Sequence, residues 1–392
     1  MLDIWPALPL IIQASERYPT RRVDNIVAAL KCSDRVCHIE LAISNILDWE
    51  IHFAVMQQPF PELKYLDFVW HSSIEEMVVV PNSFLGGLAP RLEYLCLEGI
   101  PFPGMLKFLL STTHLVTLRL DDIPHSGYIS PDVMVAALST LTSLDFLSLI
   151  FESPESCPDL ETRRLPSSTR SVLPILTGFR FQGVSEYLED LVTDIDAPQL
   201  NNLRITFFND SVFDMPQLIR FISRTPMWSS LEIALVFLHD NTAGIHFRPQ
   251  THDHVDLRVS TLCEGLDWQL SSLEQVCTSC LPVLSTLRDL HIYDLLDSRP
   301  DWKDNIENRL WLELLHPFAA VKNLYIPENI SPRIGPALQE LTGGRATELL
   351  PTLENIFLKG LESSGHVQKG IGQFVTARQV SSHPVTISRW EN

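Results

Sequence analysis

The chain carries a short apolar motif that recurs from roughly residue 36 to residue 358. Each copy has an apolar residue, two variable residues, a second apolar residue, one variable residue and a third apolar residue. A clear copy is Leu92, Leu95 and Leu97, with Ile100 following. This alternation of apolar and polar positions is typical of a strand with one buried face. The pattern therefore predicts many short strands spread along the chain.

The spacing of these strands is that of a repeat protein. Their middle apolar positions are separated by roughly 23 to 34 residues, which fits one supersecondary unit per repeat and is typical of leucine-rich repeats. These positions are Ile39, Leu66, Leu95, Leu118, Leu147, Phe179, Leu203, Ala234, Leu257, Leu290, Leu324 and Ile356. The copies at 231–236 and 255–259 are degenerate versions of the motif.

Stretches with helical spacing lie between the strands. They are residues 23–32, 132–141, 215–224, 272–284, 308–315 and 334–341. Ser130, Asp214 and Ser331 precede three of these stretches and are expected to cap them. Alternating strands and helices with right-handed crossovers give a parallel sheet with helices on its outer side. The predicted fold is an α/β, leucine-rich-repeat-like solenoid, or horseshoe, with a concave parallel sheet.

The repeats divide the chain into two expected regions. Residues 1–362 form an irregular solenoid, in which 152–170 and 239–254 interrupt the periodicity and are expected to be loops. Residues 363–392 are expected to cap the open end of the solenoid, with a helix at 368–378 and a strand at 384–390.

Charge and cysteine content narrow the classes of partner. The 29 Lys and Arg against 48 Asp and Glu give a net charge of −19, which disfavours nucleic acid and anionic membranes as partners. No uncharged apolar run reaches the roughly 18 residues that span a bilayer. Seven scattered Cys are typical of reduced thiols, so the expected location is cytoplasmic or nuclear.

Motifs of catalysis and cofactor binding are weak in this sequence. Gly365 and Gly370 have the spacing of a phosphate-binding loop, but Ile371 and Gly372 stand where Lys and Ser or Thr are needed. A G-x-S-x-G nucleophile elbow is also lacking. We therefore predict a non-enzymatic protein that has no cofactor.

A zinc site is the remaining candidate for chemistry. Cys277 and Cys280 have ligand-like spacing, with Cys263, His252 and His254 before them. The alternative is that both Cys belong to the apolar side of a helix. Because a second C-x-x-C is lacking, we predict no metal site.

One row of strand residues is expected to face solvent on the concave side. Strand side chains alternate, so the residue between the last two apolar positions points away from the helices. This row reads Glu40, Asp67, Cys96, Arg119, Ser148, Arg180, Arg204, Leu235, Arg258, His291, Tyr325 and Phe357. Flanking positions add Tyr94, Asn202, Phe237 and Tyr293.

The row suggests a binding groove in an otherwise acidic protein. We predict that Arg119, Arg180, Arg204, Arg258, His291, Tyr325 and Phe357 bind an acidic or phosphorylated protein segment, because Arg recognises carboxylate and phosphate and aromatic residues act as anchors. The alternative is that neighbouring carboxylates neutralise these arginines. The candidates are Asp67, Asp121, Asp256 and Asp289.

Longer stretches of the chain resemble the repeat region of fungal F-box proteins. They include DNIVAALKCSDRVCHIELAISN at 24–45, NSFLGGLAPRLEYLCLEGIPFPG at 82–104 and QFVTARQVSSHPVTISRW at 373–390. Further stretches are 56–68, 114–154, 173–209 and 216–226. The resemblance implies a leucine-rich-repeat fold that recognises substrates for a ubiquitin ligase.

F-box proteins usually carry a helical segment before the repeats, which docks onto the Skp-type adaptor of a cullin-RING ligase. The start of this chain, MLDIWPALPLII, resembles the region after that segment. We therefore expect adaptor and cullin partners only if such a segment precedes Met1. The alternative is a repeat-only structural or regulatory interaction protein with no link to ubiquitin.

Overall fold

The computed structural model describes the greater part of the chain. The described residues are 8–14, 23–70, 79–157, 170–208, 213–251, 255–280, 282–294, 307–341, 343–359 and 365–390. The chain forms two compact units, Met1–Leu200 (unit 1) and Asn201–Asn392 (unit 2). Each unit is described separately below.

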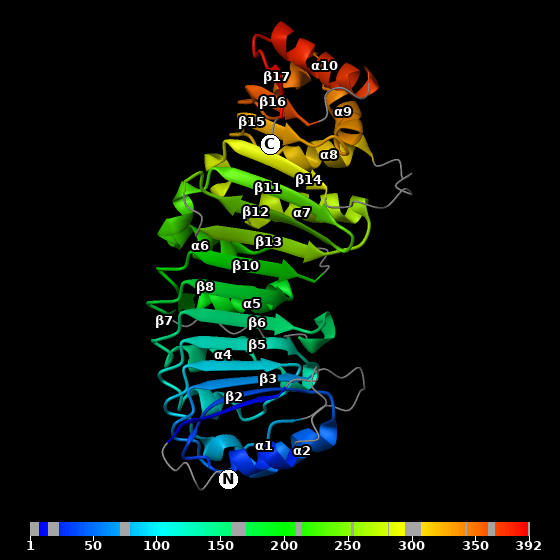
Figure 1. Ribbon diagram of the computed structural model, residues 1–392. Coiled ribbons are helices and arrows are strands. Elements are labelled where there is room, and N and C mark those ends of the chain that lie inside the picture. Colours follow the sequence, from blue (N-terminus) through cyan, green and yellow to red (C-terminus); the bar gives the residue numbers. More distant parts are fainter. Residues whose placement is uncertain are drawn as a thin grey trace. The chain divides into compact units, whose positions relative to one another are not determined.

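Unit 1 contains a parallel sheet with the strand order β1-β2-β3-β4-β5-β6-β8 (Figure 1). Its strands are β1 (Leu10–Ala14), β2 (Val36–Ile43), β3 (Tyr65–Trp70), β4 (Tyr94–Glu98), β5 (Thr117–Ile123), β6 (Phe146–Phe151) and β8 (Gly178–Gly183). A two-stranded ladder joins β7 (Ser171–Val172) and β9 (Ile195–Asp196). The middle apolar position of each repeat is fully buried, as Leu66, Leu95 and Leu118 show.

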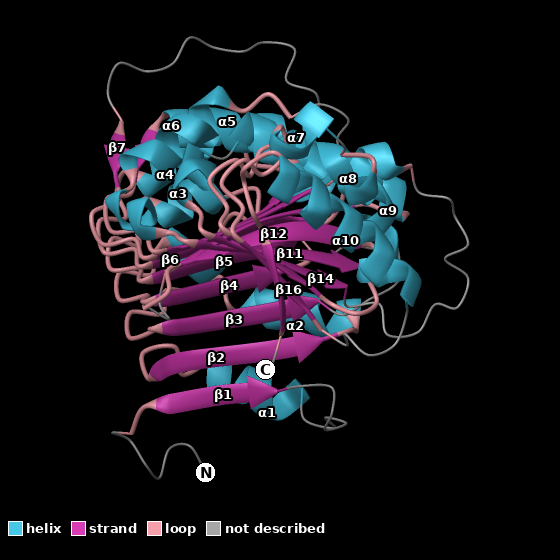
Figure 2. Ribbon diagram, turned by 90° about the horizontal axis from the view of Figure 1, so that it is seen from above, coloured by secondary structure: helices cyan, strands magenta, loops and turns pink. Residues whose placement is uncertain are grey.

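The helices of unit 1 connect successive strands. They are α1 (Val23–Leu30), α2 (Ile46–Val55), α3 (Met105–Leu109), α4 (Pro131–Leu138) and α5 (Ser185–Thr193). Figure 2 shows α4 and α5 on one side of β5 and β6. Leu138 and Leu188 are fully buried on these helices. Side chains on the other side of the strands form what we call the open face.

Unit 2 contains the strand order β10-β13-β12-β11-β14-β15-β16-β17. Its strands are β10 (Asn202–Phe207), β11 (Ile233–His239), β12 (Thr242–Arg248), β13 (Asp256–Leu262), β14 (Asp289–Asp294), β15 (Asn323–Ile326), β16 (Asn355–Leu358) and β17 (Thr386–Arg389). Its helices are α6 (Pro216–Arg224), α7 (Leu266–Cys280), α8 (Asn308–Leu315), α9 (Ser331–Gln339) and α10 (Gly365–Val380). None of the helices in the described part of the chain is long and apolar enough to cross a bilayer.

The predicted α/β solenoid of the leucine-rich-repeat kind is confirmed, with one correction in unit 2. Residues 239–254 were expected to be a loop, but Thr242–Arg248 forms β12, which pairs antiparallel with both β11 and β13. The segment folds back through a two-residue turn at Asp240 and Asn241, because His239 pairs with Thr242. As a result β13, rather than β11, lies beside β10. The expectation of a purely parallel sheet is therefore wrong at this point.

The expected helix caps are corrected at two positions. Ser130 occupies the N-cap position of α4 as predicted, but its side chain makes no capping hydrogen bond. Asp214 and Ser331 are not caps, because Met215 precedes α6 and α9 begins at Ser331 itself. Of the other expected loop, 152–170, residues 158–169 lie outside the described part.

The C-terminal segment contains the expected helix and strand, as α10 and β17. A buried arginine on α10, Arg378, anchors this segment to the preceding repeat. Its guanidinium donates hydrogen bonds to the carbonyls of Ala346 (3.2 Å), Pro351 (3.3 Å) and Leu353 (3.1 Å). Burial lowers the pKa of Arg378. The boundary at residue 362 stays a prediction.

Candidate functional site

The predicted row of open-face residues is in register within each unit. In unit 1, direct strand pairing joins Glu40, Asp67, Cys96, Arg119, Ser148 and Arg180. In unit 2 it joins Arg204, Arg258, His246, Leu235, His291, Tyr325, Phe357 and Ser388. The sequence order missed His246, because β12 was expected to be a loop. The two-residue alternation of 242–248 and the turn residues before it are the signals that could have found this strand.

Arg119 in unit 1 is already bound by a carboxylate. Its Nε and Nη2 atoms donate to Asp121 Oδ2 at 3.1 and 2.5 Å. Ser148 Oγ donates to the other carboxylate oxygen at 2.6 Å. Burial opposes the charge of Arg119, but Asp121 outweighs it and raises the pKa of the guanidinium. This geometry agrees with the alternative that a neighbouring carboxylate neutralises the arginine.

Beside Arg119, the open face of unit 1 carries a stack of three rings. His38 and Tyr65 lie 4.1 Å apart and Tyr65 and Tyr94 lie 4.2 Å apart, measured between ring centroids, and the rings are nearly parallel. The Tyr65 hydroxyl donates to Asp67 Oδ2 at 3.2 Å. Burial raises the pKa of the Asp67 carboxyl and of the Cys96 thiol next to it. A thiol with a raised pKa is a poor nucleophile.

Arg180 differs from Arg119 because its side chain is exposed. It has no ion-pair partner within 4 Å among the residues that the structure describes. Burial and the charge of Asp121 raise the pKa of the nearby Asp122, and the charge of Arg180 only partly opposes them. Within the described part of the chain, Arg180 is thus exposed and outside any ion pair, whereas Arg119 is paired.

In unit 2, the two predicted arginines lie side by side on β10 and β13. Arg204 forms an ion pair with Asp256 at 3.0 Å, and His246 Nε2 lies 2.6 Å from the same carboxylate. Burial favours the neutral acid, but the bond from His246 and the nearby charges lower the pKa of Asp256. Arg258 instead lies over the ring of Phe237, with 5.9 Å between its Cζ atom and the ring centroid.

The remaining predicted residues form an aromatic ladder, defined as His291, Tyr325 and Phe357. Ring centroids are 3.9 Å apart for His291 and Tyr325 and 4.5 Å apart for Tyr325 and Phe357, with planes within 9° of parallel. Burial lowers the pKa of His291 to about 4, so its ring is neutral at pH 7. Trp390 lies against the ladder, 5.6 Å from Tyr325. These rings are half-buried and lie on the open face.

A polar ladder two residues before the aromatic ladder fixes the register of these strands. Asn323 donates to Asp289 at 2.6 Å, and Asn355 donates to Asn323 at 2.8 Å. Thr386 extends the ladder to β17 with a bond of 2.5 Å to Asn355. Because side chains two apart share a face, this bonding holds the rings one above another.

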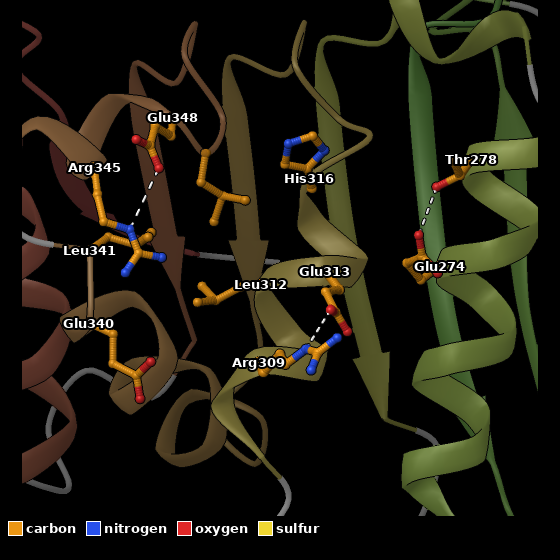
Figure 3. Close-up of a pocket in the computed structure, with 11 residues that line it drawn as sticks. Glu274, Thr278, Arg309, Leu312, Glu313, His316, Glu340, Leu341, Arg345 and Glu348 are labelled. Carbon is orange, nitrogen blue, oxygen red and sulfur yellow. Dashed lines mark hydrogen bonds and ion pairs between the residues drawn. The ribbon is translucent and has the colours of Figure 1, made fainter.

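A separate hollow of about 760 Å³ lies between helices of unit 2 (Figure 3). Side chains of α7 and α8, of the residues that directly follow α8 and α9, and of the segment 345–349 line it. Two of its arginines are paired: Arg309 binds Glu313 at 2.6 Å and Arg345 lies 3.6 Å from Glu348. Glu274 accepts a hydrogen bond from Thr278, and Glu340 accepts one from Asn308.

The candidate metal ligands are not assembled in the described part of the chain. It contains no group of three or more His, Cys, Asp or Glu that could hold an ion. Cys277 and Cys263 are buried, whereas His252 and His254 lie outside the described residues. The prediction that the protein has no metal site stays a prediction.

Comparison with known proteins gives little beyond the fold. No protein-family model matches the chain, and no curated protein matches its sequence. Among solved structures, the leucine-rich repeat-containing protein LegL7 of Legionella pneumophila is similar over 97% of this chain and 90% of its own, with 10% identity and a TM-score of 0.32. At that TM-score the similarity carries no argument about function. The resemblance to F-box proteins stays an expectation from the sequence.

Proposed function

We propose that this protein is a non-enzymatic recognition scaffold that binds a partner protein on the open face of unit 2. The observation that carries the proposal is the aromatic ladder. Its rings stack in register on the side of the sheet that faces away from the helices, where they remain partly accessible. Aromatic side chains of this kind are common binding hot spots, and solenoid repeats commonly present extended binding surfaces.

The charges around the ladder favour an acidic or phosphorylated segment as the partner. Arg258 lies on an aromatic ring, and no ion pair within 4 Å engages it among the described residues. Arg204 contributes less, because Asp256 already binds it. The charge of Arg258 acts on Asp256, but an arginine that no carboxylate contacts attracts carboxylate or phosphate more strongly than one in an ion pair.

Affinity capture from cell lysate tests this proposal. The wild-type chain is compared with the variant Tyr325→Ser/Phe357→Ser and with Arg258→Ser. We expect the double variant to lose one defined partner. Arg258→Ser is expected to retain less of it at low salt concentration, with the difference from the wild type shrinking as the salt concentration is raised. Trp268→Ser is the matched control, because Trp268 is 63% exposed on α7 and away from the open face. The same catch from all four proteins would contradict the proposal, provided that their thermal unfolding midpoints agree.

We further propose that the protein acts as part of a ubiquitin ligase, on the basis of its sequence resemblance to F-box proteins. It predicts that a chain carrying the helical segment of F-box proteins before Met1 captures a Skp-type adaptor and a cullin. Capture of the partner without these subunits from such a chain would instead favour a repeat-only interaction protein. The two capture results are independent, because the adaptor and the partner bind different parts of the chain.

A further inference from the structure

Trp390 folds across the aromatic ladder from the far edge of unit 2. It follows β17, which pairs with β16, yet its ring contacts residues on β14 and β15. Its centroid lies 5.8 Å from His291, 5.9 Å from Tyr293 and 5.6 Å from Tyr325, at angles of 64 to 66°. The indole therefore meets several rings edge-on, which is a favourable aromatic geometry.

The Trp390 side chain is held by only a few weak contacts. Its backbone N–H donates to the Leu358 carbonyl at 2.8 Å, which fixes the chain up to this residue. Its side chain is half-buried, and the Lys359 ammonium lies 5.8 Å from the ring centroid. A few ring contacts and one cation–π contact hold the indole, and each of these is individually weak.

We infer that the ladder is a docking site for an aromatic side chain within an acidic segment of the partner, and that Trp390 fills this site until the partner displaces it. The inference rests on the proposed function and names the chemistry of its ligand. The seated indole shows that the ladder and Tyr293 accept an aromatic ring.

The surrounding charges favour acidic residues on either side of that ring. Lys359 lies on one side of the site, and Arg248 acts electrostatically on His291 and Tyr293. The nearby carboxylate, Asp289, is buried and accepts hydrogen bonds from Asn323 and Gln250. The charge of Asp289 acts on His291 and Tyr325. Among the described residues named here, however, the exposed charges are the cations Arg248 and Lys359, which complement an acidic segment.

The size of the effect follows from population arithmetic. A site that its own side chain fills most of the time binds a partner more weakly by the fraction that is open. Aromatic pairs each shift an equilibrium by about two- to tenfold. Removing Trp390 is therefore expected to raise the affinity for a partner segment by about tenfold.

Fluorescence anisotropy with a labelled Asp-Glu-Trp-Glu-Asp peptide tests the inference. We expect Trp390→Ala to bind this peptide about tenfold more tightly than the wild type, and Trp268→Ala to match the wild type. Tyr325→Ser abolishes binding if the ladder is the site. A peptide with Ala in place of the Trp, and one with Lys in place of the acids, are expected to bind much more weakly. Unchanged or weaker binding by Trp390→Ala would overturn the inference.

A second measurement observes the displacement in the intact protein. With 5-fluorotryptophan, the fluorine resonance that disappears in Trp390→Phe reports on Trp390. Peptide addition is expected to move it towards the position of a solvent-exposed indole; a resonance that does not move overturns the inference even if Trp390→Ala fails to fold. Concentration-dependent dimerisation of Trp390→Ala in sedimentation would also overturn it, because a second copy would then be the occupant.

These outcomes separate the inference from the proposed function. If ladder variants lose the captured partner while Trp390 is not displaced, the inference fails and the proposed function stands. If no ladder variant changes partner capture, the proposed function fails.

Discussion

The open faces of the two units present residues from equivalent strand positions, but these residues differ in the groups that they already bind. In unit 1, Arg119 is held by Asp121, and the Tyr65 hydroxyl is held by Asp67. In unit 2, the corresponding row ends in the aromatic ladder, whose rings are half-buried. A polar group whose partner lies within the sheet gains little from a new ligand, whereas a partly exposed ring gains by being covered.

The comparison shows why position alone does not identify a binding residue. Arg119, Arg180, Arg204 and Arg258 occupy equivalent strand positions. Two of them are bound by carboxylates of the same or the neighbouring strand, and these carboxylates also accept bonds from Ser148 or His246. Whether an arginine of this row can bind a partner therefore depends on whether a neighbouring carboxylate already binds it.

The largest difference is expected when aromatic residues are removed from each face. Tyr325→Ser/Phe357→Ser is expected to weaken partner binding by about a hundredfold, since buried aromatic anchors contribute most of the binding energy. The matched change in unit 1, Tyr65→Ser/Tyr94→Ser, is expected to change it by less than about threefold. Calorimetry with the captured partner measures both, and equal losses would remove the distinction between the faces.

For the free energy of unfolding, the larger loss is expected from substitutions in unit 1 rather than in unit 2. Asp121→Ala leaves Arg119 and Ser148 without their acceptor in a largely buried place, so we expect the free energy of unfolding to fall by about 2 kcal/mol. Asp256→Ala is expected to cost about 1 kcal/mol, because the Arg204 side chain is 49% exposed and water replaces its partner. Urea unfolding compares the two variants. A larger loss of unfolding free energy for Asp256→Ala would contradict the conclusion that the open-face arginine of unit 1 depends more on its carboxylate partner.

The half-buried histidine of the aromatic ladder, His291, is expected to contribute to the pH dependence of stability. Burial lowers the pKa of His291 to about 4, against the effect of Asp289, whereas an unfolded histidine titrates near 6.5. Between these pH values the unfolded chain takes up a proton that the folded chain does not, so the free energy of unfolding falls as the pH drops from about 6.5 to about 4.

The substitution His291→Gln is expected to remove that part of the pH dependence. Urea midpoints at several pH values, measured for both proteins, test this. Burial also lowers the pKa of His52 on α2, so His52→Gln serves as the comparison from unit 1. Parallel curves for wild type and His291→Gln would show that the ladder histidine is not responsible.

The smallest effect is expected at the glycine beneath Phe237. A Cβ atom at Gly244 would lie 2.3 Å from Phe237 Cζ, so Gly244→Ala forces the ring to move and disturbs its contact with Arg258. We expect partner affinity to fall about threefold. The unfolding midpoint is expected to fall as well, because Ser260 Cβ would also lie only 2.9 Å from the added atom and moves only with its strand. Gly372→Ala, where nothing lies within 4 Å, is the control. Identical affinities for both variants would place Phe237 outside the site.

Much of the fold could be predicted because it depends on local alternation. The strands around Leu95, Leu118 and Leu324 are predicted by the two-residue period, and their middle residues are fully buried. The open-face row follows from the same period, so its register within each unit was accessible from the sequence. The strand at Thr242–Arg248 was missed because it lies between two copies of the repeat motif, where a loop was expected.

The candidate site was less accessible. The sequence places Arg119 and Tyr325 on the open face, but it does not show that Asp121 engages the first or that Trp390 covers the second. Both contacts depend on how side chains are directed in three dimensions. Arg378 is a similar case, since its three carbonyl acceptors lie 25 to 32 residues away along the chain.

By itself, the sequence determined the repeat, the alternation of buried and open positions and the residue types presented on each face. These properties are local, because a side chain's face is set by its own strand. The tertiary structure alone decided that β12 stands between β11 and β13, which of the arginines are neutralised and that Trp390 returns to the aromatic ladder. Those outcomes join residues distant in the chain, and their energies depend on burial and on neighbours that only the folded chain brings together.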